Sequence, residues 1–237
     1  MKLPPVLRYF GSKWRSAPRY PEPKHDVIVE PFAGGAGYSL HYPERQVILI
    51  EANPVVAGIW KWLIQADPNE IAELPLVKPG ESIANYEIRK EAKDFIGFWN
   101  TISGAAPQYR MVPSAERIPA SFWNERIRER TAKLVEHIRH WKIVNGDMFK
   151  FRWNGKATWF VDPTYQHGYR YPGSSAIDYG RLAEWCKTRK GQVIVCENEL
   201  ADWLDFKPLA DLHAAPRAQF GGAAARRSKE CIWVKDG

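Results

Sequence analysis

Short apolar runs alternate along the chain with segments whose apolar residues repeat at helical spacing. A run that is apolar at nearly every position is typical of a strand buried on both faces, whereas an i, i+3, i+4 repeat predicts a helix with one buried face. We therefore expect strands at 27–29, 46–50, 142–144, 158–161, 192–196 and 230–234. Strands separated by helices predict an α/β fold with a doubly wound, mostly parallel sheet.

Several segments carry the helical repeat. Pro54 suits the first position of a helix, which we expect to run to about Gln65. Further helices are expected over 86–99, from 121 toward 141, and over 178–188. The first 26 residues are basic, aromatic and proline-rich, and we expect them to be mostly irregular.

Residues 67–120 interrupt this alternation of strands and helices. Prolines punctuate the segment, which is longer than a simple connection needs. We predict that 67–140 form a small, mainly helical insertion in a domain built from 1–66 and 141–237. The insertion either has a function of its own or is merely structural.

The first strand leads into a glycine-rich turn. Glu30 is followed by Pro-Phe-Ala-Gly-Gly-Ala-Gly at 31–37, where glycines let the backbone approach a ligand, and we expect a helix to begin directly afterwards. Glu51 ends the second strand about twenty residues later, the spacing at which nucleotide sites place an acid on ribose hydroxyls. A nucleoside-containing cofactor is the expected ligand, and a glycine turn without a ligand is the alternative.

The strand at 158–161 ends in Asp162-Pro163-Thr164-Tyr165. A carboxylate, a fixed carbonyl and a flat ring suit a planar heterocycle with an exocyclic amine, because the amine donates to both oxygens while the rings stack. Open α/β sheets bind their ligands at this end of the strands. Asp and Pro also favour ordinary turns, which is the competing interpretation.

These motifs share one order along the chain. It runs from Tyr9-Phe10-Gly11-Ser12-Lys13 through the glycine turn, Glu51-Ala52-Asn53-Pro54 and Gly146-Asp147 to Asp162-Pro163-Thr164-Tyr165. In this order nearly the whole chain resembles the Dam-like (D12 class) DNA adenine-N6 methyltransferases. The resemblance implies the Rossmann-like class I methyltransferase fold and S-adenosyl-L-methionine as cofactor.

The resemblance also implies roles for individual residues. The cofactor would be bound by Tyr9, Lys13, Glu30, Phe32, Gly34, Gly35, Glu51, Asp147 and Asp162. Tyr9 and Lys13 would face its methionine end, and Asp147 would accept a hydrogen bond from its adenine amine. Asp162, Pro163 and Tyr165 would be catalytic: the first two would bind the target amine and the ring would stack on the base.

The implied activity is methyl transfer to adenine N6 in a specific double-stranded DNA sequence, with the base flipped out of the duplex. No metal is needed. Residues 67–140 would be the target-recognition module, with side chains able to read base edges or phosphates at Gln108, Arg110, Arg117, Asn124 and Arg126.

Three residues depart from the family pattern. Thr164 replaces the usual second proline, Ala36 stands where the last glycine is expected, and Glu51 replaces aspartate. Thr164 leaves the target base open, so a cytosine-N4 or RNA amino-methyltransferase is an alternative. A catalytically silent DNA-binding protein and a nicotinamide-dependent oxidoreductase are the others, although Gly146-Asp147 and 162–165 argue against the oxidoreductase.

Lys and Arg outnumber Asp and Glu by 34 to 27, which gives a net charge of +7 and moderately favours a polyanionic partner. Two basic segments are candidates for contact with DNA. One is the helix face with Arg126, Arg128, Arg130 and Lys133, for which a solvated face is the alternative. The other is the stretch 217–229, where Arg226, Arg227 and Lys229 either touch phosphate or flank the last strand as charged gatekeepers.

Cys186, Cys196 and Cys231 lack metal-site spacing, and we interpret them as reduced core thiols. The sequence shows neither a signal peptide nor an apolar run of transmembrane length. We therefore expect a cytoplasmic protein, bacterial or phage-encoded, that does not bind membranes and is a monomer or a weak dimer.

Overall fold

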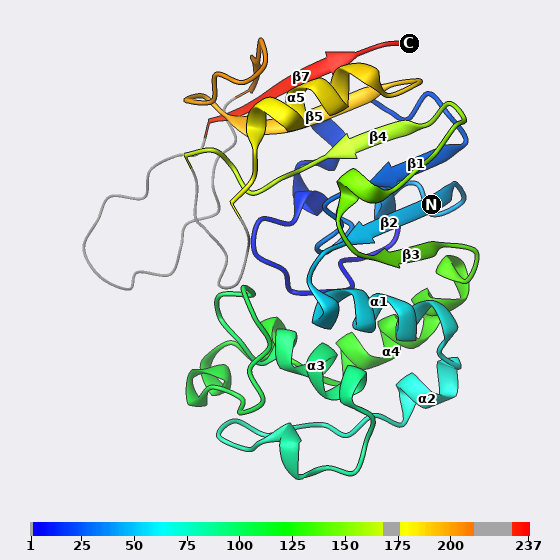
Figure 1. The fold of residues 1–237 in the computed structure, drawn as a ribbon. Coiled ribbons are helices and arrows are strands. Elements are labelled where there is room, and N and C mark those ends of the chain that lie inside the picture. The colour runs from blue at the N-terminus through cyan, green and yellow to red at the C-terminus, as the bar shows by residue number, and fades with distance from the viewer. Residues whose placement is uncertain (1, 168–175, 211–228) are drawn as a thin grey trace.

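A central sheet organises the protein, whose computed structural model describes residues 2–167, 176–210 and 229–237. Within these ranges seven strands lie in the order β3-β2-β1-β4-β5-β7-β6 (Figure 1). Their bounds are β1 Val27–Glu30, β2 Gln46–Glu51, β3 Lys142–Asn145, β4 Thr158–Val161, β5 Val193–Asn198, β6 Lys207–Ala210 and β7 Glu230–Lys235. The first five strands pair in parallel, and β7 runs antiparallel between β5 and β6.

The strand order reverses between β1 and β4. The chain first moves outward from β1 to β2 and β3, then returns to the other side of β1, where Ile28 pairs with Thr158 and Val29 with Trp159. In open α/β sheets such a reversal leaves a crevice at the carboxyl ends of the two central strands, where ligands bind. The predicted α/β class with a mostly parallel sheet is confirmed.

Helices cover the sheet and fill the space beyond β3 (Figure 1). They are α1 Pro54–Gln65, α2 Pro68–Ala72, α3 Lys90–Trp99, α4 Glu125–Val135 and α5 Tyr179–Thr188. The Asn53 side chain accepts the Val55 amide at 2.9 Å, and Pro54 follows it, so α1 begins and ends where the sequence predicts. Asp67, Asn124 and Asp178 cap α2, α4 and α5 in the same way.

The helix expected after the glycine turn is absent, and that prediction was wrong. A three-residue 3-10 helix, Ser39–His41, stands there instead. The next residue, Tyr42, leaves helical geometry at φ −131° and ψ 53° because it precedes Pro43, and the residue before a proline is disfavoured in the helical region.

Two other predicted helices begin later than the sequence suggests. The helix expected over 86–99 begins at Lys90, and the one expected from 121 begins at Glu125, where the Asn124 side chain accepts the Ile127 amide. Its last turn continues as a 3-10 helix, Glu136–Ile138. Strand β6 was not predicted, because it is a short segment on the sheet edge and contains Pro208.

The strands alternate between two apolar clusters, as a sheet covered on both faces requires. Ile28, Leu49 and Phe160 belong to the larger cluster, which includes residues of α1, α3 and α4. Val29, Ile50 and Trp159 belong to the smaller one, which includes residues of α5. Residues 67–140 contribute none of the seven strands.

The three cysteines lie within these clusters or beside them. All are buried and free, as predicted for core thiols. Of the helices described, none combines the length and apolar character that a bilayer crossing requires.

Candidate functional site

Carboxylates gather at one edge of the sheet. Glu30, Glu51 and Glu197 lie at the carboxyl ends of β1, β2 and β5, and Asp162 directly follows β4. Because β7 runs in the opposite direction, its first residue, Glu230, reaches the same edge. All but Asp162 are buried, and a buried carboxylate needs hydrogen-bond donors or a cation as compensation.

Glu51 joins the glycine turn to the start of α1. Its carboxylate accepts the backbone amide of Gly34 at 2.9 Å and that of Asn53 at 2.8 Å. Burial raises the pKa of Glu51 above its ordinary value, although these amides oppose the shift. The structure thus brings together the turn and the acid that the sequence predicts as one site.

The glycines of this turn are required by the N-terminal arm, which we define as residues 2–20. A Cβ at Gly37 would lie 2.5 Å from the Trp14 backbone nitrogen, and a Cβ at Gly34 would lie 2.7 Å from the Tyr9 ring. Gly34 also has φ +45°, a conformation that favours glycine. The sequence analysis assigned these glycines to a ligand and missed their contact with the arm.

The remaining residues of the turn have structural partners of their own. Ala36 adopts φ +48° although it is not a glycine. Phe32 is half-buried and packs on the smaller apolar cluster. Glu30 accepts the Ser39 amide at 2.8 Å, and burial raises the pKa of this carboxyl to about 8.

Asp147 lies one strand further along the same edge. It is exposed, and its side chain accepts the Phe149 amide at 2.9 Å. The neighbouring Gly146 amide and the Asn145 side chain both donate to the Glu51 carbonyl, at 3.0 and 2.9 Å. The loop that carries Asp147 is therefore fixed to the end of β2.

Lys13 brings a cation to the carboxylates at the centre of the edge. Its ammonium lies 2.7 Å from Asp162 Oδ1 and 4.0 Å from Glu230 Oε1, and it donates to the Gly11 carbonyl at 3.1 Å. Burial alone would lower the pKa of Lys13, but Asp162 and Glu230 raise it above its ordinary value. Burial raises the pKa of Asp162 to about 6, against the opposing effect of Lys13.

Tyr165 is held from two sides. Its hydroxyl donates to Glu230 at 2.6 Å, and the Lys13 ammonium lies 4.9 Å from the centre of its ring. The Tyr179 hydroxyl donates to the preceding Thr164 carbonyl at 2.7 Å. Asp162 and Tyr165 of one predicted motif therefore form a cluster with Lys13 of another.

Two functional carboxylates of this edge were missed by the sequence analysis. Glu230 accepts both Tyr165 and Tyr20, and Glu197 accepts the Gln166 amide at 2.8 Å and the Trp203 indole at 3.1 Å. Burial raises the pKa of Glu197. For Glu197 the available signal was an acid near the carboxyl end of an apolar strand, as it was for Glu51, whereas Glu230 begins its strand and had no such signal.

Of the five predicted recognition residues, Gln108, Arg110, Arg117 and Arg126 are exposed and Asn124 is half-buried. Gln108 and Arg117 have no side-chain hydrogen bond that ties them to the rest of residues 67–140 among those described. The other three also serve the insertion itself: Arg110 donates to the Gly80 carbonyl, Asn124 caps α4, and Arg126 donates to the Ala120 carbonyl at 3.4 Å.

The basic face expected on α4 is only partly a free face. Arg128 donates to the Leu74 carbonyl and Arg130 to the Pro5 carbonyl, both at 3.0 Å, and both side chains are half-buried. These two arginines tie α4 to neighbouring segments, so the expectation of one continuous solvated or DNA-contacting face was wrong for them. Arg126 and Lys133 are exposed.

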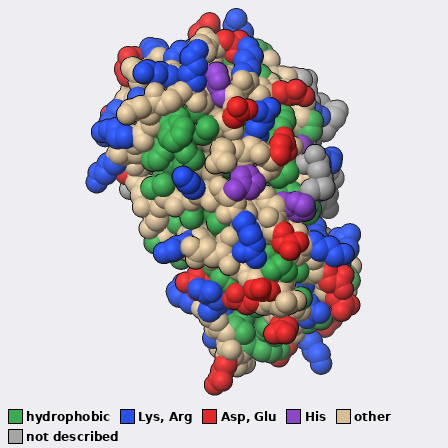
Figure 2. Space-filling view, turned by 90° about the vertical axis from the view of Figure 1, so that its right-hand side faces the viewer, with side chains coloured by type: hydrophobic (Ala, Val, Ile, Leu, Met, Phe, Trp, Pro, Cys, Tyr) green, Lys and Arg blue, Asp and Glu red, His purple; other side chains and the backbone are tan. Residues whose placement is uncertain are grey.

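On the face of the molecule in Figure 2, basic and acidic side chains are interspersed. The basic stretch expected to contact phosphate lies, except for Lys229, outside the described residues, and so do residues 168–175 of the loop after Tyr165. In the described ranges no three His, Cys, Asp or Glu side chains are grouped so as to hold a metal ion.

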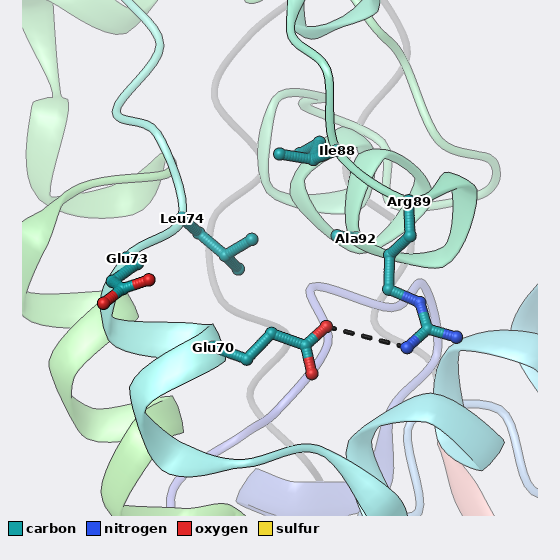
Figure 3. A pocket seen from close by; sticks show the side chains of 6 residues that line it. All are labelled: Glu70, Glu73, Leu74, Ile88, Arg89 and Ala92. Carbon is teal, nitrogen blue, oxygen red and sulfur yellow. Dashed lines mark ion pairs between the residues drawn. The ribbon is translucent and has the colours of Figure 1, made fainter.

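A surface cavity of about 280 Å³ lies in the inserted region, away from the sheet edge (Figure 3). It lies between α2 and α3, and an ion pair of 3.6 Å joins Glu70 to Arg89 across it. Its lining residues are Glu70, Glu73, Leu74, Ile88, Arg89 and Ala92, which include none of the predicted site residues.

No protein-family model matches this chain, and no curated protein matches it.

Proposed function

We propose that the protein is an S-adenosyl-L-methionine-dependent DNA methyltransferase, similar to the Dam-like (D12 class) enzymes, that methylates adenine N6 in a specific double-stranded sequence. One observation carries the proposal. The glycine turn bound to Glu51 and the cluster of Lys13, Asp162 and Tyr165 lie at the same sheet edge, on the two strands that flank the reversal of strand order.

The residues at the turn fit the proposed cofactor. Each Glu51 oxygen accepts one backbone amide and keeps a lone pair with which to accept a ribose hydroxyl. Asp147 is exposed on the adjoining loop and retains acceptor capacity for the adenine amine. The bound cofactor would supply an electrophilic methyl group.

Charge at the centre of the site favours a cationic ligand. Two carboxylates, Asp162 and Glu230, face one ammonium, so with all three ionised the cluster carries one net negative charge. A sulfonium compensates that charge, whereas the phosphates of a nicotinamide dinucleotide would add to it. The antiparallel β7 also departs from the parallel 3-2-1-4-5-6 order of dinucleotide-binding sheets.

The chemistry requires an acceptor for the target amine, whose lone pair is delocalised into the ring. Asp162 would accept one amine hydrogen and the Pro163 carbonyl the other, which draws the lone pair toward the methyl group. Lys13 contacts Oδ1 of Asp162 and leaves Oδ2 available to the amine. Tyr165 would stack on the base. Placement of the amine in line with the sulfur contributes roughly 7–11 kcal/mol in favourable cases.

A base in duplex DNA must flip out to reach this cluster, which costs about a few kcal/mol. Phosphate contacts offset that cost, and they make binding weaken as salt rises. The exposed Gln108, Arg117 and Arg126 of the insertion are the side chains that we assign to DNA.

The proposal is tested by incubating the protein with unmethylated duplex DNA and isotopically labelled S-adenosyl-L-methionine, then identifying nucleosides by mass spectrometry. We expect labelled N6-methyladenine. Asp162→Asn removes one acceptor at nearly constant shape and should abolish transfer, while calorimetry should show that the cofactor still binds, weakened by the loss of one negative charge. Asp26→Asn, at an exposed carboxylate paired with Arg45, is the matched control and should keep full activity.

Other results would point to the alternatives. Methylated cytosine as the product would show that cytosine, and not adenine, is the target base. Cofactor binding without transfer would indicate a silent DNA-binding protein. Tight NAD binding with no response to S-adenosyl-L-methionine would overturn the proposal. Glu51→Gln should weaken cofactor binding. In the wild type each Glu51 oxygen accepts one backbone N–H, and in the variant the glutamine NH2 group would face one of these donors and could not accept from it.

A further inference from the structure

Glu230 is a buried carboxylate that the proposed reaction does not use directly. Its side chain is 9% exposed. Oε2 accepts the Tyr165 hydroxyl at 2.6 Å and the Tyr20 hydroxyl at 3.1 Å, while Oε1 lies 4.0 Å from the Lys13 ammonium. The first residue of β7 thus meets the N-terminal arm and the loop after β4.

The two tyrosine hydroxyls beside the Glu230 carboxylate act as hydrogen-bond donors. Burial, followed by the charge of neighbouring acids, raises the pKa of Tyr165 and of Tyr20 well above the ordinary value, so both phenols stay protonated and donate. A phenol has a single hydrogen to donate. Both hydroxyls therefore give that hydrogen to Glu230 in the described structure, and the Tyr20 hydroxyl also contacts the Cys196 thiol.

The two tyrosines differ in what their rings contact. The Tyr20 ring packs edge-on against Phe160 at 5.2 Å, inside the larger apolar cluster. The Tyr165 ring faces the Lys13 ammonium beside Asp162. The Tyr165 ring also packs on that cluster from its edge, so the same carboxylate holds one ring inside the core and one that reaches from the core to the site.

We propose that Glu230 is a positioning residue for the methyl transfer: it orients the Tyr165 ring for stacking and helps to hold Lys13 beside Asp162. This inference rests on the proposed function. Glu230 acts through Tyr165 and Lys13 and touches neither the methyl group nor the target amine. A merely structural Glu230 would stabilise the fold and leave turnover unchanged.

A double-mutant cycle separates these roles. The variants are Glu230→Gln, Tyr165→Phe and the two combined, with Tyr20→Phe as the matched control because it removes the other hydroxyl from the same carboxylate. Turnover, the KM for DNA, the affinity for S-adenosyl-L-methionine and the urea midpoint are measured for each.

We expect Glu230→Gln and Tyr165→Phe each to lower kcat, on the order of tenfold. Cofactor affinity should stay within about twofold in Tyr165→Phe and should fall in Glu230→Gln, which removes one negative charge from the cluster. The combined variant should be little worse than Glu230→Gln alone, since both changes remove one contact. Tyr20→Phe should lower the urea midpoint while kcat stays near that of the wild type. Additive losses, or an unchanged kcat in Glu230→Gln, would overturn the assignment.

Two further measurements keep the inference testable. If Glu230→Gln does not fold, Glu230→Asp retains the charge with a shorter reach and should show the same selective loss of kcat. If the wild type transfers no methyl group, the proposed function fails, and NMR of fluorotyrosine-labelled protein then tests positioning alone. A shifted or broadened Tyr165 signal in Glu230→Gln supports it, and an unchanged signal refutes it.

Discussion

The Lys13 ammonium lies 2.7 Å from the Asp162 carboxylate, which joins the N-terminal arm to the loop after β4. Lys13 comes from an arm that packs on the glycine turn, and Asp162 ends a strand on the other side of the strand-order reversal. This pair therefore links the predicted cofactor motif to the predicted catalytic motif.

Breaking this buried pair should destabilise the protein strongly. Lys13→Met leaves the half-buried Asp162 and the buried Glu230 without their cation, and removing one partner of a buried pair costs about 3–5 kcal/mol. Urea unfolding measures the change. Lys24→Met is the control: Lys24 pairs with Asp236 at 2.9 Å with both side chains more than half exposed, and such pairs contribute about 0–1 kcal/mol. Equal losses in the two variants would contradict the role given to Lys13.

Stability should fall as pH rises through the window set by Glu30. Its ordinary pKa is 4.5 and burial raises the pKa to about 8 in the folded protein. Between these values the folded state holds a proton that the unfolded state has released, so a rise in pH favours unfolding. Asp162 adds the same trend between 3.8 and about 6.

Glu30→Gln removes the titrating group while keeping a neutral side chain of similar shape. The free energy of unfolding, measured by urea at several pH values, should then fall less steeply between about pH 4.5 and 8, by a difference on the order of a few kcal/mol. Asp26→Asn, at an exposed carboxylate, should leave the wild-type slope in place. If the free energy of unfolding of Glu30→Gln fell with pH as steeply as that of the wild type, the Glu30 carboxyl would not titrate as described.

Replacing Gly37 of the glycine turn by alanine should displace the N-terminal arm. In Gly37→Ala the new Cβ would meet backbone nitrogens of Trp14 and Lys13 at 2.5 and 2.8 Å, and backbone atoms cannot rotate aside. We expect a loss of roughly 1–3 kcal/mol, as for overpacking elsewhere. Gly58→Ala, in the middle of α1, meets only Glu91 at 3.8 Å and should stabilise the protein by about 0.5–1 kcal/mol. Calorimetric melting of both variants checks the opposite signs.

The sequence predicts the framework because short-range rules dominate it. Pro54 after a capping Asn53 defines the start of α1, and the apolar runs of β1, β2 and β4 match strands buried on both faces. Glu51, Asp162 and Tyr165 were identifiable because each follows or ends such a run.

Contacts between distant segments escaped the sequence analysis. No local pattern signals that Gly37 lies against Trp14, or that Glu230 accepts two tyrosines far away in the chain. Arg128 and Arg130 have the spacing of an exposed helical face, yet carbonyls of Leu74 and Pro5 bind them. Tertiary placement decides these partners, and spacing along the chain does not encode it.

Introducing a proline at position 164 should leave the target base unchanged. The Thr164 carbonyl accepts the Tyr179 hydroxyl at 2.7 Å, and proline keeps that carbonyl. The groups that we assign to the base are Asp162, the Pro163 carbonyl and Tyr165, and none of them is altered. Proline at 164 would bias Pro163 toward an extended backbone, which changes loop stiffness more than pocket chemistry.

We therefore expect Thr164→Pro to yield N6-methyladenine with a modest change in rate, measured by mass spectrometry of digested DNA. Thr164→Ala is the matched control, since it removes the hydroxyl without stiffening the loop. A switch from adenine to cytosine in either variant would assign base choice to position 164. Because the side chains of Asp162 and Tyr165 are already held by Lys13 and Glu230, their orientation is fixed from outside the loop, and we expect the third position of the motif to tolerate either substitution.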